Sequence, residues 1–97
     1  MIFFLPYIYI IIGHMVTLQV VTVPGCVECR RFEEWWKVNS AQFPNVKFEE
    51  INALEQKGQE LVFKYSIFSS PGLIINGDLF STGGVNTEKL AAKLKEL

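Results

Sequence analysis

The residues best suited to chemistry are two cysteines, Cys26 and Cys29, which stand three positions apart in the segment VPGCVECRRF. This spacing lets two cysteines close a small disulfide, and we expect a helix to begin at the first of them. A thiol at a helix N-terminus loses its proton more readily, because the unpaired backbone N–H groups there carry partial positive charge. Cys26 is therefore the candidate nucleophile. Cys29 lies one helical turn later, facing the expected sheet, and can attack a mixed disulfide formed on Cys26.

Other uses of the same two cysteines stay open at this point. They can be inert core thiols, or they can bind a metal ion or an iron–sulfur cluster. Structural zinc takes four Cys or His ligands, and the chain has only these two cysteines and one distant histidine, His14. A four-cysteine site therefore requires a dimer, and we expect no metal site in a single chain. A redox-inert interaction module is a further alternative, because a fold alone does not establish an activity.

The neighbouring segments predict a strand-to-helix junction at the cysteines. Residues 16–23 (VTLQVVTV) are uncharged and rich in β-branched side chains, as a central strand buried on both faces requires. A Pro-Gly pair ends this strand. Cys29, Phe32 and Trp36 then follow at helical spacing. This stripe predicts an amphipathic helix that begins near the first cysteine and ends near residue 40.

The rest of the chain predicts three further strands and two further helices. We expect strands at residues 46–51, 73–75 and 79–81 and helices at residues 55–65 and 87–97, the earlier of these helices being weakened by Gly58. Asn76-Gly77-Asp78 is a hairpin signal, so the last two strands should be antiparallel. The order β-α-β-α-β-β-α predicts an α/β fold in which helices flank a four-stranded mixed sheet, with the first helix as a right-handed crossover.

Composition limits the classes of protein that remain. The chain has 97 residues, of which 49% are hydrophobic and 20% charged, and its net charge is −1. These values fit one globular domain, which we place at residues 15–97. Without an excess of basic residues we expect no nucleic-acid partner. Two cysteines are too few for a disulfide-rich secreted scaffold. We expect a monomer in the cytoplasm.

Residues 1–14 (MIFFLPYIYIIIGH) are an apolar, uncharged N-terminal extension. As a helix, residues 2–12 would span about 16 Å, half of the ~30 Å hydrocarbon core of a membrane, and Pro6 interrupts them. The extension also lacks the basic start and the small-residue cleavage site of a signal peptide. Three interpretations stay open: Met15 is the natural or an alternative start, residues 2–12 contact a membrane surface and make the domain membrane-associated, or the extension adds an edge strand.

Residues 16–97 resemble the thioredoxin-fold thiol–disulfide oxidoreductases, especially the small thioredoxin- and glutaredoxin-like redox-active disulfide proteins. Three segments carry the resemblance. VVTVPGCVEC is similar to the active-site turn, YSIFSSPGLIINGDLF to the cis-proline segment, and STGGVNTEKL to the diglycine turn before the last helix. The resemblance implies a thioredoxin-like fold and the reduction of protein or small-molecule disulfides, a form of electron transfer in cell redox homeostasis. It implies that Cys26 and Cys29 are catalytic and form the redox-active disulfide, without a further cofactor.

The resemblance also implies where a substrate binds. Pro71 would follow a cis peptide bond and pack against the cysteine pair. The backbone of Ser70 would then pair with an extended substrate chain through β-type hydrogen bonds. Gly83 and Gly84 would complete this substrate site. The implied partners are a disulfide substrate and an electron donor, either a reductase or glutathione.

The sequence departs from the family pattern at positions that affect the chemistry. Gly25 stands where thioredoxins have a Trp, and Val27-Glu28 replace their Gly-Pro. Val20 stands six residues before Cys26, where thioredoxins have a buried Asp that assists proton transfer. Glutaredoxins hold the amino group of glutathione with an Asp pair after the diglycine, whereas residues 85–87 are Val-Asn-Thr here.

We assign redox tuning to Pro24, Gly25 and Glu28. The Glu28 carboxylate stands close to Cys26 in sequence and should disfavour its thiolate, which opposes the helix dipole. A less stabilised thiolate makes the reduced form less favourable and the couple more reducing. We therefore expect a reductase rather than a strong oxidant.

Overall fold

The computed structural model describes residues 15–97, so the interpretations of residues 1–14 lie outside the described residues. Its elements are, in order, β1 (Val16–Thr22), α2 (Val27–Asn39), the short 3-10 helix η1 (Ser40–Gln42), β2 (Val46–Asn52), α3 (Gln56–Tyr65), β3 (Gly72–Ile75), β4 (Asp78–Thr82) and α4 (Thr87–Glu96). This order confirms the predicted β-α-β-α-β-β-α arrangement. Within this described part of the chain, no helix is long and apolar enough to cross a membrane.

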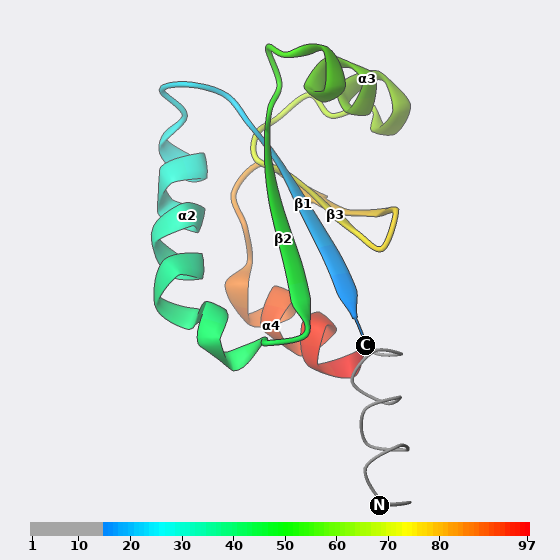
Figure 1. Ribbon diagram of the computed structural model, residues 1–97. Coiled ribbons are helices and arrows are strands. Elements are labelled where there is room, and N and C mark those ends of the chain that lie inside the picture. The colour runs from blue at the N-terminus through cyan, green and yellow to red at the C-terminus, as the bar shows by residue number, and fades with distance from the viewer. Residues whose placement is uncertain (1–14) are drawn as a thin grey trace, which may run out of the picture.

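The four strands form one mixed sheet in the order β2-β1-β3-β4. β1 runs parallel to β2 and antiparallel to β3, and β3 runs antiparallel to β4. β1 is therefore an inner strand, and it points its C-terminal end toward the start of α2 (Figure 1). Leu18 and Val20 are fully buried, and Val21 is 1% exposed. Both faces of β1 are covered, which is why its sequence carries no charge.

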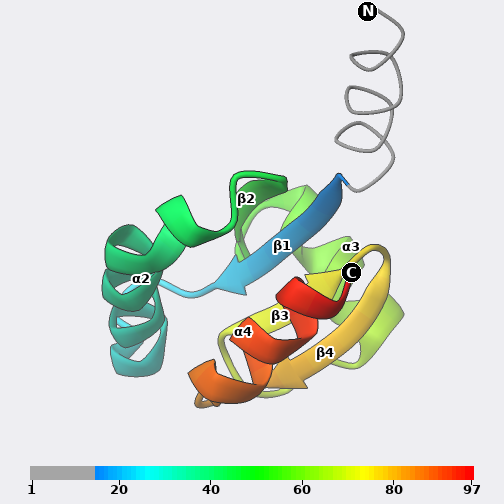
Figure 2. The ribbon, with the colours of Figure 1, turned by 90° about the horizontal axis from the view of Figure 1, so that it is seen from below.

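Helices cover both faces of the sheet. Phe32 of α2 and Leu90 and Leu94 of α4 share a core with the β1 side chains of Leu18 and Val20. On the opposite face, Val21, Ile67 and Ile74 form a second cluster with the apolar side of α3. Figure 2 shows α4 and α3 on opposite sides of the sheet. Leu90 and Leu94 are thus the inward positions of α4.

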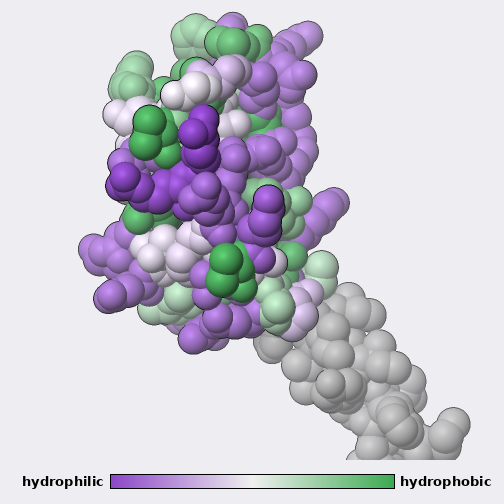
Figure 3. Space-filling view, turned by 90° about the vertical axis from the view of Figure 1, so that its left-hand side faces the viewer, coloured by the Kyte–Doolittle hydropathy of each residue, from purple (hydrophilic) through white to green (hydrophobic). Residues whose placement is uncertain are grey.

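An aromatic cluster seats α2 against the edge of the sheet. The ring centroids of Trp36 and Phe48 lie 5.1 Å apart, and those of Trp36 and Phe43 lie 5.9 Å apart. The Phe32 ring stacks on Trp36 at 6.5 Å and lies 6.5 Å from Phe48. The opposite side of α2 faces solvent and is largely hydrophilic, with isolated hydrophobic residues (Figure 3). The cluster fixes the direction in which α2 leaves the cysteine turn.

The predicted hairpin turn is confirmed, and α4 begins at a side-chain cap. Asn76 and Gly77 have φ values of 50° and 84°, which a tight hairpin turn requires. The side chain of Asn86 caps α4 by accepting the backbone N–H of Lys89 at 3.1 Å. The hairpin therefore turns at two residues that adopt positive φ values readily, and α4 begins at a residue that can cap it.

Gly58 has a different role from the expected weakening of α3. It is the buried residue of that helix. A Cβ at this position would lie 2.0 Å from the backbone oxygen of Asn52 and 2.6 Å from the Cα of Ala53. The helix thus rests directly on the chain that leaves β2. The glycine permits this close approach and so helps to position the C-terminal end of β2.

Candidate active site

Cys26 stands at the N-cap of α2, as the sequence predicted. Its backbone is extended, with φ −77° and ψ 119°, and its Sγ accepts the backbone N–H of Cys29 at 3.1 Å. Gly25 before it has a φ of 81°, a conformation that side chains rarely adopt. The turn therefore depends on Gly25 at the position where thioredoxins carry a Trp. Pro24 and Gly25 line one hollow together with both cysteines.

The segment before β3 meets the cysteines from the other side. Ser70 Oγ donates a hydrogen bond to Cys26 Sγ at 3.2 Å, and the Cys26 thiol approaches the Ser70 carbonyl oxygen at 3.7 Å. The Ser70–Pro71 peptide bond is cis, and Pro71 is buried. These two residues are 44 and 45 positions from Cys26 in sequence, and the pairing of β1 with β3 brings them to the end of β1.

The diglycine turn completes the same surface. The backbone N–H of Gly83 donates to the Pro71 carbonyl at 3.1 Å. A Cβ on Gly84 would lie 3.4 Å from Oε1 of Glu28. The structure thus brings every predicted substrate-binding position, Ser70, Pro71, Gly83 and Gly84, to the start of α2.

The two thiols differ in pKa. Burial raises the pKa of the Cys26 thiol. Hydrogen bonds from the side chains of Cys29 and Ser70 and from the backbone of Cys29 and Glu28 lower it. The net pKa lies below the ordinary cysteine value. Cys29 is only 2% exposed. Burial, together with the hydrogen bond to Cys26, raises the pKa of Cys29 to about 11. Cys26 is thus the better nucleophile and Cys29 the protected partner.

The Glu28 side chain lies beside Arg31 and the diglycine turn. The Glu28 carboxylate is turned toward Arg31, with 3.3 Å between Oε2 and the Arg31 Nη1, and toward Gly84. Its backbone, in contrast, helps to lower the pKa of Cys26. The effect of the Glu28 carboxylate on the thiolate and on the redox couple therefore stays a prediction.

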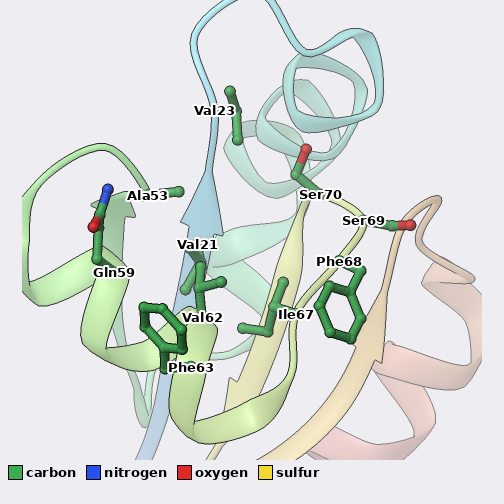
Figure 4. A pocket seen from close by; sticks show the side chains of 10 residues that line it. All are labelled: Val21, Val23, Ala53, Gln59, Val62, Phe63, Ile67, Phe68, Ser69 and Ser70. Carbon is green, nitrogen blue, oxygen red and sulfur yellow. The ribbon is translucent and has the colours of Figure 1, made fainter.

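An apolar hollow of about 390 Å³ adjoins Ser70. Figure 4 shows Val62 and Phe63 of α3 on one side and Ile67 and Phe68 of the following segment on another, with Ser70 at the rim. Phe63 is 83% exposed and Phe68 is 90% exposed. This surface was not predicted from the sequence, and the only signal for it was a pair of phenylalanines, one on α3 and one just after it.

A second missed feature is a pair of glutamates. The side chains of Glu33 in α2 and Glu50 in β2 hydrogen-bond each other. Their contact, the burial of Glu50 and the charge of Glu33 raise the pKa of Glu50 to about 6. Glu33 also lines the hollow that contains both cysteines. The parallel register of β1 and β2 creates this contact, and the sequence alone did not indicate that register.

No group of three or more Cys, His, Asp or Glu side chains within residues 15–97 could hold a metal ion. The two cysteines in this part of the chain are free thiols in the structure. A cluster shared between two chains stays an untested alternative.

A match to a family model shows which family the chain belongs to. The model described as "Thioredoxin domain" matches residues 16–96. The chain belongs to the thioredoxin family. No curated protein matches the chain significantly. Several solved thioredoxins share its fold at low identity.

Fasciola hepatica thioredoxin has a TM-score of 0.68 and 19% identity, over 96% of this chain and 89% of that protein. Oxidised thioredoxin O1 from Arabidopsis thaliana has a TM-score of 0.69 and 20% identity, over 94% and 88% of the two chains. Mitochondrial thioredoxin 3 from Saccharomyces cerevisiae has a TM-score of 0.66 and 16% identity, over 97% and 90%. These likenesses establish the thioredoxin fold. The Cys-x-x-Cys pair on that fold supports thiol–disulfide oxidoreductase activity in general.

Proposed function

We propose that this thioredoxin-family protein reduces disulfides in polypeptide substrates through the dithiol of Cys26 and Cys29. One observation carries the proposal: Cys26 Sγ accepts hydrogen bonds from the Cys29 N–H at 3.1 Å and the Ser70 hydroxyl at 3.2 Å, while Cys29 is buried behind it. These donors help to lower the pKa of Cys26, whereas burial and the hydrogen bond to Cys26 leave the pKa of Cys29 raised. The pair therefore has an accessible nucleophile and a protected resolving thiol, as two-step exchange requires.

The reaction consists of two displacements at sulfur. In the first, the Cys26 thiolate attacks a substrate disulfide, a new bond forms between Cys26 and one substrate sulfur, and the other leaves as a thiolate. In the second, Cys29 loses its proton and attacks Cys26 Sγ. The Cys26–Cys29 disulfide forms, and the second substrate sulfur leaves with the electron pair of the broken bond. Two electrons have then passed from the protein to the substrate, and a donor dithiol must restore Cys26 and Cys29.

The surface around Cys26 favours an extended polypeptide as substrate. Ser70 lies between the nucleophile and the apolar hollow, so a chain whose cysteine reaches Cys26 can place a neighbouring side chain there. Exposed Phe63 and Phe68 favour an apolar side chain. Glutathione, with two carboxylates and no apolar side chain, gains less from this hollow. We propose a reductase as the electron donor, with glutathione as the second candidate.

Trapping of the mixed disulfide tests the proposal. Cys29→Ser should accumulate a covalent complex with insulin, a polypeptide with accessible disulfides, because Cys26 attacks but nothing resolves the product. Intact mass under non-reducing conditions should show an adduct that dithiothreitol releases. Cys26→Ser is the matched control and should give no adduct. A folded Cys29→Ser protein that forms no adduct with insulin or with a disulfide peptide carrying apolar flanks would overturn the proposal.

A further inference from the structure

The second displacement needs a proton acceptor that the site so far does not provide. Burial and the hydrogen bond to Cys26 raise the pKa of Cys29 to about 11, so its thiol keeps its proton near neutral pH. The β1 position nearest to this role is Val20, which has no carboxyl group and is fully buried. The Glu28 carboxylate is turned to Arg31 and Gly84. A carboxylate elsewhere around the cysteines is therefore the candidate acceptor of this proton.

Glu33 lies close enough to Cys29 to be this acceptor. It stands four residues after Cys29, so the two side chains lie on the same side of α2, one turn apart. Both residues line a hollow of about 240 Å³ that also contains Cys26, Arg30 and Asn52. This hollow is polar and large enough for water, which can connect a thiol and a carboxylate that do not touch.

Glu50 extends the path away from the sulfur. It pairs with Val20 in the parallel register of β1 and β2, so it stands beside the strand position that lacks an acid. Paired residues of adjacent strands point to the same face of a sheet, here the face covered by α2. Its side chain hydrogen-bonds Glu33. Two carboxyls in hydrogen-bond contact share one proton more readily than either carboxyl holds one alone.

We propose that the Glu33–Glu50 pair accepts the proton of Cys29 as Cys29 attacks the mixed disulfide on Cys26. The inference rests on the proposed function. In this step the Cys29 proton passes through water in the hollow to Glu33, and the pair then shares it. The Cys29 sulfur gives its electron pair to Cys26 Sγ, and the substrate sulfur leaves as a thiolate. After reduction of the disulfide by the donor, the pair returns the proton to Cys29.

The charges around the pair are mixed. On α2, Arg30, Glu34 and Lys37 line an adjoining hollow together with Glu33, and from β2 that hollow is lined by Phe48 and Glu50. Arg30 also lines the hollow of the cysteines. Two cations and one further carboxylate thus line the hollow that both glutamates share.

The two phases of the reaction with 5,5′-dithiobis(2-nitrobenzoate) test the inference on the full chain. With one equivalent of reagent, attack by Cys26 releases the first coloured thiolate, and attack by Cys29 on the mixed disulfide releases the second. Glu33→Gln and Glu50→Gln should each slow the second phase about tenfold near pH 7. This is below the roughly 10²–10⁴ typical of general-base catalysis, because solvent reaches the hollow. The first phase should change less than twofold.

Glu60→Gln is the matched control, since it removes the same charge from an exposed position of α3 that lines neither hollow, and both phases should keep their wild-type rates. In the wild type the second phase should accelerate as pH rises through about 6, where Glu50 ionises, and the Gln variants should lack this step. Equal second-phase rates in Glu33→Gln and Glu60→Gln, or a wild-type profile without the step, would overturn the inference. The wild-type profile decides even if a variant fails to fold. Absence of both phases in the wild type would instead contradict the proposed function.

Discussion

Ser70 should control how much Cys26 exists as the thiolate. Its hydroxyl donates to Cys26 Sγ at 3.2 Å, and this hydrogen bond is one of the interactions that lower the pKa of Cys26. Ser70→Ala removes the donor and adds no bulk. We expect the pKa of Cys26 to rise and the thiolate fraction at a fixed pH below that pKa to fall.

The magnitude follows from the strength of such a bond. A hydrogen bond to a charged group contributes about 1.5–3 kcal/mol. Ser70 and Cys26 are both partly exposed, so water replaces part of the lost interaction and the lower end applies. A loss of about 1.4 kcal/mol is a tenfold change in an equilibrium constant. The rate of alkylation of Cys26 near pH 7 should therefore fall by up to about tenfold.

The assay is the rate of iodoacetamide alkylation of the reduced protein across a series of pH values. Ser69→Ala is the matched control, because Ser69 is the exposed serine one position earlier. It should leave the curve unchanged, while Ser70→Ala should move the curve to higher pH. Superimposable curves for the wild type and Ser70→Ala would refute the view that the segment before Pro71 activates Cys26.

Two further predictions concern stability. Gly58→Ala should lower the free energy of unfolding, measured in urea, by about 3 kcal/mol, because its Cβ would lie 2.0 Å from the Asn52 backbone oxygen and no rotamer can relieve that contact. Glu60→Ala, at an exposed position of the same helix, should lower it far less. Equal losses of stability in the two variants would contradict the packing described. The pKa of Glu50 is raised to about 6 from 4.5, so the wild type should lose stability as pH rises between these values. Glu50→Gln should therefore be more stable above pH 6 by about 0.5 kcal/mol, a value reduced for solvent exposure, and a variant less stable than the wild type at that pH would count against repulsion in the pair.

The fold was largely predictable because its signals are local. The uncharged segment 16–23 indicated the inner strand, and the stripe of Cys29, Phe32 and Trp36 indicated the helix that follows. Asn76-Gly77 fixed the hairpin. Each of these patterns depends on residues close in sequence, and the structure confirms all three elements within a residue or two.

Contacts between elements that are distant in sequence were harder to predict. Gly58 looked like a helix-weakening residue, because its close approach to β2 is invisible until the two elements are packed. The Glu33–Glu50 contact depends on the register of β1 with β2, which the hydrophobic pattern of an edge strand specifies weakly. Redox tuning by Glu28 stays a prediction, since side-chain direction at a helix start decides whether a neighbouring charge acts on a thiol.

The most direct test of redox function is a titration of the Cys26–Cys29 couple. Purified protein would be equilibrated in buffers of defined dithiol–disulfide ratio, alkylated, and its free thiols counted by intact mass, with metal content measured on the same sample. We predict a single two-electron transition between about −280 and −200 mV, in the region of thioredoxins and glutaredoxins, and no bound metal. Thiols that stay protected at every potential together with bound zinc or iron, or a potential near the −120 mV of strong oxidants, would contradict the account.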